Sequence, residues 1–127
     1  TMCPLLEGED RLRLLNYQHN LITKIDNLHN LPNLIFLDLY NNQIRQIQNL
    51  QHLTTLRVLM LGKNMLGTIE NMNSLTRLDV LDLHSNAISK IDNLSSLAEL
   101  RVLNLAGNHI TAVENLEGLL FLTELNL

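Results

Sequence analysis

The residues with the clearest chemical potential in this chain are Asp82 and His84, which stand two positions apart in the segment LDLHSN. Side chains two positions apart on a strand share a face, so the carboxylate can orient the imidazole there. Nucleophilic catalysis also requires a hydroxyl or thiol within hydrogen-bond reach of the imidazole, and nothing in the sequence places one. The pattern therefore favours a solvated polar pair over a catalytic one.

Other candidate sites are equally incomplete. The histidines at 19, 29, 52, 84 and 109 have no metal-binding spacing, and Cys3 is the only cysteine. The segment LGKN around Gly62 lacks the other residues of a phosphate-binding loop. We therefore predict a protein that is not an enzyme, with no catalytic residue, metal, cofactor or small-molecule substrate.

Composition narrows the class of partner. The chain has 127 residues and a net charge of −4, with no block of like charge, which argues against nucleic acid and anionic membranes as partners. No apolar run approaches the roughly 20 residues that span a bilayer, and the first residues do not resemble a signal peptide. A single cysteine predicts a reducing environment, and hence the cytoplasm.

A period of 22 residues organises nearly the whole chain. Within each unit, segments such as LDL and LNL place two leucines on one face of a short strand. An asparagine then follows, and its amide can pair with buried backbone where the chain leaves the strand. These residues form a predicted asparagine ladder: Asn20, Asn42, Asn64, Asn86 and Asn108.

A second asparagine column precedes the return segment of each unit. We interpret its members as N-caps of short helical turns, partly 3₁₀, because an acidic residue often stands before them and favours a helix N-terminus. The members are Asn27, Asn49, Asn71, Asn93 and Asn115.

These columns are typical of leucine-rich repeats. They predict an α/β solenoid, a horseshoe with a short-stranded parallel sheet on the concave face and short helical or 3₁₀ turns on the convex face. We expect one domain over 1–127, in which 1–11 form a partial N-terminal cap, 12–121 form five repeats, and 122–127 begin a truncated sixth. An apolar last strand would have an open edge, so we expect the chain to be part of a longer array.

Outward residues on the strands form the candidate binding surface. A row of valines fits ordinary strand packing, whereas two of the four aromatic residues fall on this face near polar groups. Gly62 separates Tyr40 from His84, and at two strand spacings, roughly 10 Å, a partner side chain is expected to fit between them. The predicted partner-binding residues are Phe36, Asp38, Tyr40, Met60, Lys63, Asp82 and His84.

The unit LxxLxxLxLxxNxIxxIxNLxx is similar to the intracellular 22-residue leucine-rich repeats of protein phosphatase 1 regulatory subunits and many ciliary proteins. More narrowly, the segments CPLLEGEDRLRLLNYQHNLITKI, DVLDLH, ELRVLNLA and LTELNL resemble leucine-rich-repeat subunits of tubulin polyglutamylase complexes. This resemblance implies a scaffold or adaptor whose partners are polyglutamylase subunits or tubulin, located at the cytoskeleton, centrosome or cilium. Ligase chemistry is then expected in another subunit.

Two alternatives stay open. The chain could instead be a regulatory subunit of protein phosphatase 1, for which recovery of that phosphatase with the chain is the discriminating observation. It could also be the targeting arm of an enzyme whose catalytic domain lies outside this chain.

Overall fold

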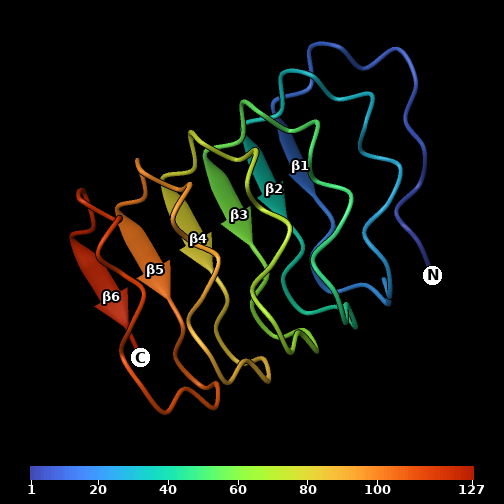
Figure 1. The fold of residues 1–127 in the computed structure, drawn as a ribbon. Helices are drawn as coiled ribbons and strands as arrows, with labels where there is room; N and C mark the ends of the chain where they lie inside the picture. Colours follow the sequence, from blue (N-terminus) through green and yellow to red (C-terminus); the bar gives the residue numbers. More distant parts are fainter.

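The computed structural model describes residues 1–127 and contains one six-stranded parallel sheet whose strands follow one another in chain order (Figure 1). Each strand pairs with the next in a constant register of one repeat, as in Leu15 with Leu37 and Leu37 with Leu59. The parallel-sheet solenoid predicted from the repeat period is therefore confirmed. The strands are β1 (Leu14–Asn16), β2 (Phe36–Asp38), β3 (Val58–Met60), β4 (Val80–Asp82), β5 (Val102–Asn104) and β6 (Glu124–Asn126).

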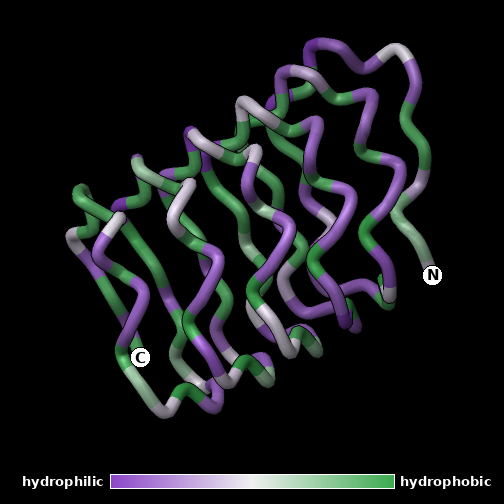
Figure 2. The backbone as a smooth tube through the Cα atoms, in the orientation of Figure 1, coloured by the Kyte–Doolittle hydropathy of each residue, from purple (hydrophilic) through white to green (hydrophobic).

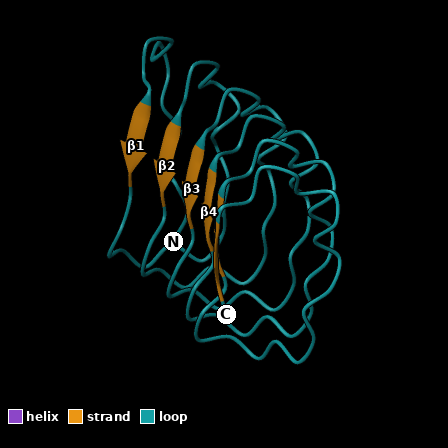
Figure 3. Cartoon of the chain, turned by 90° about the vertical axis from the view of Figure 1, so that its left-hand side faces the viewer, coloured by secondary structure: helices purple, strands orange, loops and turns teal.

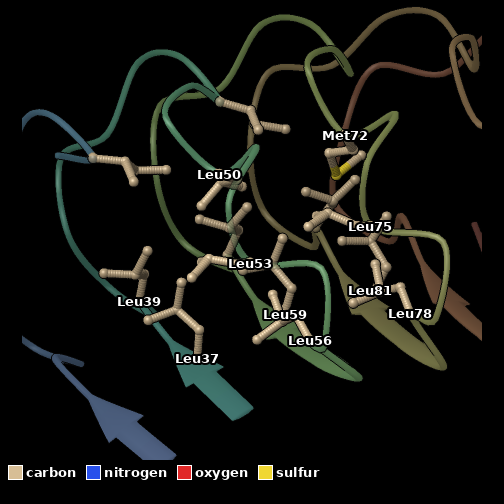
Figure 4. Packing of buried hydrophobic residues seen from close by; sticks show 14 of the residues in the cluster. Leu37, Leu39, Leu50, Leu53, Leu56, Leu59, Met72, Leu75, Leu78 and Leu81 are labelled. Atoms are coloured by element: carbon tan, nitrogen blue, oxygen red, sulfur yellow. The ribbon is translucent and has the colours of Figure 1, made fainter. Parts of the chain in front are cut away.

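The core is a single cluster of buried apolar side chains that runs through the stacked coils. The central residue of each strand points inward, and leucines of the return segment meet it from the opposite side (Figure 4). Apolar and polar residues alternate along each coil in the same order (Figure 2). Burying a leucine stabilises the fold by about 2 kcal/mol relative to exposing it, so the repeated layer is the main source of stability.

The return segments contain no helix, so the predicted helical or 3₁₀ convex face is wrong (Figure 3). Successive leucines instead close single turns three residues apart, for example Leu53 N–H to Leu50 C=O at 3.0 Å and Leu56 N–H to Leu53 C=O at 3.1 Å. A 3₁₀ helix needs such bonds from consecutive residues. Here only every third residue donates one, because that spacing turns every leucine toward the core.

The second asparagine column does not cap helices. Its five members adopt left-handed backbone with φ between 58° and 61°, a conformation that asparagine tolerates better than most residues. Each side-chain amide donates to a backbone carbonyl of the preceding coil, as in Asn71 to Ile47 at 2.8 Å. The acidic residues before this column do not stabilise a helix N-terminus either. Asp26 and Asp92 each accept a hydrogen bond from the N–H of the asparagine that follows.

Residues 1–11 stack on the first repeat in the register of a return segment. Met2 pairs with Lys24, one repeat further on, and the Cys3 carbonyl accepts a hydrogen bond from the Asn27 amide at 2.9 Å. Cys3 is buried in the position that Ile25 holds in the next coil, and burial raises the pKa of its thiol. Sequence inspection missed this register because a cysteine replaces the isoleucine.

Candidate functional site

The first asparagine column links each coil to its neighbours beside the exit of each strand. The Asn64 amide donates to the carbonyls of Leu39, Leu61 and Gly62 at 3.0, 3.0 and 3.2 Å, and its Oδ1 accepts the Ile44 N–H. Asn42, Asn86 and Asn108 make the corresponding bonds. These side chains therefore satisfy backbone groups of two coils at once.

Asn20 differs from the other four residues of this column. Its amide donates only to carbonyls of its own coil, those of Tyr17 and Gln18, and no donor pairs with its Oδ1. The residue is exposed, whereas Asn42, Asn64 and Asn86 are buried. The Asn20 side chain therefore makes no hydrogen bond to the preceding coil.

Polar residues at the ends of the strands cap the backbone that follows. The Asp38 carboxylate accepts the Tyr40 N–H, and the Asp82 carboxylate accepts the His84 N–H, both at 3.0 Å. Asn16 and Asn104 do the same in β1 and β5. Such a side-chain turn is an ordinary use of Asp and Asn, and sequence reasoning missed it although the residue types recur at one column.

Four of the predicted partner-binding residues, Tyr40, Lys63, Asp82 and His84, form a connected group with His19, and we term these five side chains the Tyr40 cluster. The Tyr40 ring stacks on His84 with centroids 5.6 Å apart and an interplanar angle of 29°. His19 meets the other side of Tyr40 edge-on at 5.4 Å. The Lys63 ammonium lies 5.7 Å from the Tyr40 centroid, within cation–π range.

The predicted gap between Tyr40 and His84 is not there. Gly62 has no side chain, and the two rings lean over it into contact, so a Cβ at this position would overlap the His84 ring. The sequence estimate placed the rings at their strand positions and left out the freedom of their side-chain torsions. Gly62 therefore permits stacking rather than opening a slot for a partner.

Asp82 and His84 do form a pair, with His84 Nδ1 at 2.7 and 2.9 Å from the two Asp82 carboxylate oxygens. Asp82 is only 7% exposed, so the imidazole is held firmly. No serine, threonine or cysteine hydrogen-bonds to this imidazole, and no three His, Cys, Asp or Glu residues lie together as a metal site. The arrangement fixes the ring for contact and for hydrogen bonding.

The other predicted residues flank the Tyr40 cluster. Met60 lies between Asp38 and Asp82 in the sheet register, and Phe36 pairs with Val58 in the next row, where both are half-buried. Phe36 contacts no other aromatic ring of the group. The structure thus brings a polar aromatic group and an apolar row side by side on the sheet face, by which we mean the outward side of β1 to β6.

Comparison with protein families matches residues 10–52 and 54–96 to Leucine Rich repeats (2 copies), which together span more than half of the chain. The chain belongs to the leucine-rich-repeat family. Human Leucine-rich repeat-containing protein 49 is 65% identical over 40 residues, 32% of this chain and 6% of the human protein. The mouse protein of that name is 61% identical over 36 residues, 28% of this chain and 5% of its own length. These relatives are far longer than the part that is matched.

Solved leucine-rich-repeat structures share the fold. A leucine-rich-repeat protein of Leptospira interrogans has a TM-score of 0.88 and 31% identity, covering 92% of this chain and 31% of its own. Internalin C2 of Listeria monocytogenes has a TM-score of 0.86 and 33% identity, covering 93% and 52%. Leucine-rich repeats are typically non-catalytic protein-binding modules. The structure has no helix long and apolar enough to cross a bilayer.

Proposed function

We propose that this leucine-rich-repeat chain is a non-catalytic scaffold that binds a protein partner through its sheet face. The Tyr40 cluster carries the proposal, because it gathers an aromatic ring, two imidazoles and two charges on an uncovered parallel sheet. Parallel sheets are usually covered on both faces. A ring that its neighbours already hold also loses little conformational freedom when a partner binds.

The proposed contact surface joins the cluster to the apolar row beside it. Tyr40 and His84 would serve as the central anchors, since buried aromatic residues concentrate binding energy in interfaces. Phe36 and Met60 would add apolar area, while Asp38, Lys63 and Asp82 would orient the partner through polar contacts.

More narrowly, we propose an adaptor subunit of a tubulin polyglutamylase complex that acts in the cytoplasm at microtubules, centrosomes or cilia. The resemblance of residues 3–25 and of three later segments to such subunits supports this assignment. The partial match to human Leucine-rich repeat-containing protein 49 supports an adaptor of this repeat class. Ligase chemistry would then reside in a partner subunit.

The test is a quantitative pull-down from ciliated-cell lysate with wild type, a Tyr40→Ala/His84→Ala variant and an Arg45→Ala/Lys90→Ala control. The control changes two exposed residues away from the sheet. Wild type and control should recover polyglutamylase subunits, and the cluster variant should bind them about thirtyfold more weakly, because losing an aromatic anchor costs about 2 kcal/mol.

Thermal denaturation of the three proteins shows whether the fold is retained. Equal recovery by the folded cluster variant would exclude the sheet face as the main interface. Enrichment of protein phosphatase 1 in place of polyglutamylase subunits would replace the narrower assignment by the regulatory-subunit alternative.

A further inference from the structure

Arginines are distributed unevenly over this chain. Five of the six stand one or three positions before a strand, and the sixth, Arg45, lies in a return segment. The acidic residues that precede the second asparagine column lie elsewhere in the repeat. The arginines therefore collect at the end of the sheet where the strands begin, which we call the basic edge, although the net charge of the chain is −4. The five arginines of this edge are Arg11, Arg13, Arg57, Arg77 and Arg101.

The backbone holds two of these arginines at a set distance. Ile35 donates its N–H to the Arg13 carbonyl at 2.7 Å, and Arg57 donates its N–H to the Ile35 carbonyl at 2.8 Å. Arg13 and Arg57 therefore lie on either side of Ile35, two strand spacings apart. That separation is about 9.5 Å along the direction that crosses the strands.

Arg13, Arg57 and Arg77 line a hollow of about 200 Å³, together with Asn33, Ile35 and Thr55. We call it the arginine hollow. Asn33 and Thr55 already donate to backbone carbonyls, which fixes its walls. None of the three guanidinium groups has a carboxylate or a hydrogen-bond acceptor within bonding distance.

Arg101 shows what such a group does when a carboxylate is present. It makes a two-pronged bond to Asp79, with both N···O distances at 2.6 Å, and the hydrogen bond lowers the pKa of that carboxyl. Guanidinium groups match carboxylates in this forked geometry. The three arginines of the hollow have the same chemistry and no bonded carboxylate; the Asp79 carboxylate near Arg57 is bonded to Arg101 instead.

We infer that the arginine hollow binds an extended acidic polypeptide segment that crosses the strands, with carboxylates at every third residue. A chain in polyproline II conformation repeats every three residues and rises about 3.1 Å per residue. Its carboxylates on one side recur every 9 Å or so, which matches the spacing of Arg13 and Arg57. Acidic segments extend by self-repulsion, so little ordering is required.

A nucleic-acid strand fits this edge less well. The lining contains no aromatic ring on which a base could stack. Asp79 lies next to Arg57 at the border of the hollow, where its N–H bonds to the Arg57 carbonyl, and Glu99 follows one coil further on; both carboxylates would repel a continuous phosphate backbone. A peptide can place separate carboxylates at the arginines and neutral residues beside the acidic groups. The inference concerns a surface apart from the Tyr40 cluster and does not depend on the function proposed for it.

The test measures fluorescence anisotropy of a labelled twelve-residue peptide with glutamate at every third position and glycine or proline between. The 127-residue chain should bind it, whereas an Arg13→Gln/Arg57→Gln/Arg77→Gln variant should bind at least tenfold more weakly. A matched control, Lys24→Gln/Arg45→Gln/Lys90→Gln, removes the same charge from other surfaces and should stay within twofold of wild type. Binding should weaken as salt is raised.

Circular dichroism of both variants checks that the fold is kept, which the exposure of these side chains favours. A peptide with glutamine in place of glutamate should not bind. Equal weakening in the two variants would show a nonspecific charge effect and overturn the inference. Tighter binding of a single-stranded oligonucleotide of equal charge would also overturn it, in favour of a nucleic-acid surface. A Tyr40→Ala variant should bind the peptide like wild type.

Discussion

The first asparagine column and the Tyr40 cluster lie only two residues apart in the chain, yet their side chains do different things. The side chains of Asn64 and its equivalents form hydrogen bonds to backbone groups of two coils. The Tyr40 and His84 rings contact each other and are not part of the apolar core cluster. After each strand, the asparagine position therefore stabilises the fold, whereas the position two residues before it is free to bind a partner.

Asn64→Ala should be the most destabilising substitution in either region. The change leaves the buried Ile44 N–H without a partner. It also removes one of two donors from the carbonyls of Leu39, Leu61 and Gly62, which keep bonds from the Asn42 amide, the Asn86 amide and the Asn41 N–H. A buried donor left unpaired costs about 1–3 kcal/mol, and the loss of the three other bonds adds to this cost, so urea denaturation should show a free energy of unfolding lower by about 3 kcal/mol.

Asn20→Ala is the matched control, because this exposed member of the column serves its own coil alone. Its expected cost is below about 1 kcal/mol. Equal losses from the two substitutions would contradict the idea that the column stabilises the array by linking coils.

The second column permits a finer comparison between hydrogen bonding and backbone conformation. Asn71→Ala removes the bond to the Ile47 carbonyl and places alanine at a φ of 58°. We expect a loss of about 2 kcal/mol in the free energy of unfolding. Asn71→Gly removes the same bond without the conformational cost, so it should lose about 1 kcal/mol. Chemical denaturation separates the two, and identical losses would argue against the conformational contribution.

The smallest expected effect on stability comes from Gly62→Ala. The added methyl would overlap the His84 ring, which would have to turn away from Tyr40 and weaken its bond to Asp82. The free energy of unfolding should therefore fall by no more than about 1 kcal/mol. The Tyr40–His84 stack should nevertheless open, and the His84 ring proton shifts in an NMR spectrum should report it.

Gly67→Ala is the control for this substitution, because a Cβ there has open space around it. It should leave the His84 signals unchanged. If Gly62→Ala also leaves them unchanged, the stack is not present in solution and the cluster loses its central contact.

Much of the fold follows from one-dimensional pattern. The 22-residue period fixed the order and register of the strands, because a coil of constant length brings equivalent residues side by side. The inward and outward rows followed from strand alternation. The same pattern hid the register of residues 1–11, where Cys3 replaces an isoleucine and Glu9 replaces a leucine.

The misassigned features are those where one residue type has two structural uses. Asparagine caps helices and also adopts left-handed backbone, and only the stacked coils show that Asn71 uses the second and bonds to Ile47. Leucines three residues apart suit either a 3₁₀ helix or separate turns. The backbone bonds decide for turns.

The amino-acid sequence by itself therefore determined the repeat, the parallel sheet, the layered core and the set of outward residues. Those properties depend on spacing along the chain, which is visible in the letters. The tertiary structure decided that Tyr40 and His84 stack across Gly62, and that Arg13, Arg57 and Arg77 surround one hollow. Such contacts depend on side-chain torsions and on the packing of neighbouring coils, and a linear pattern specifies neither.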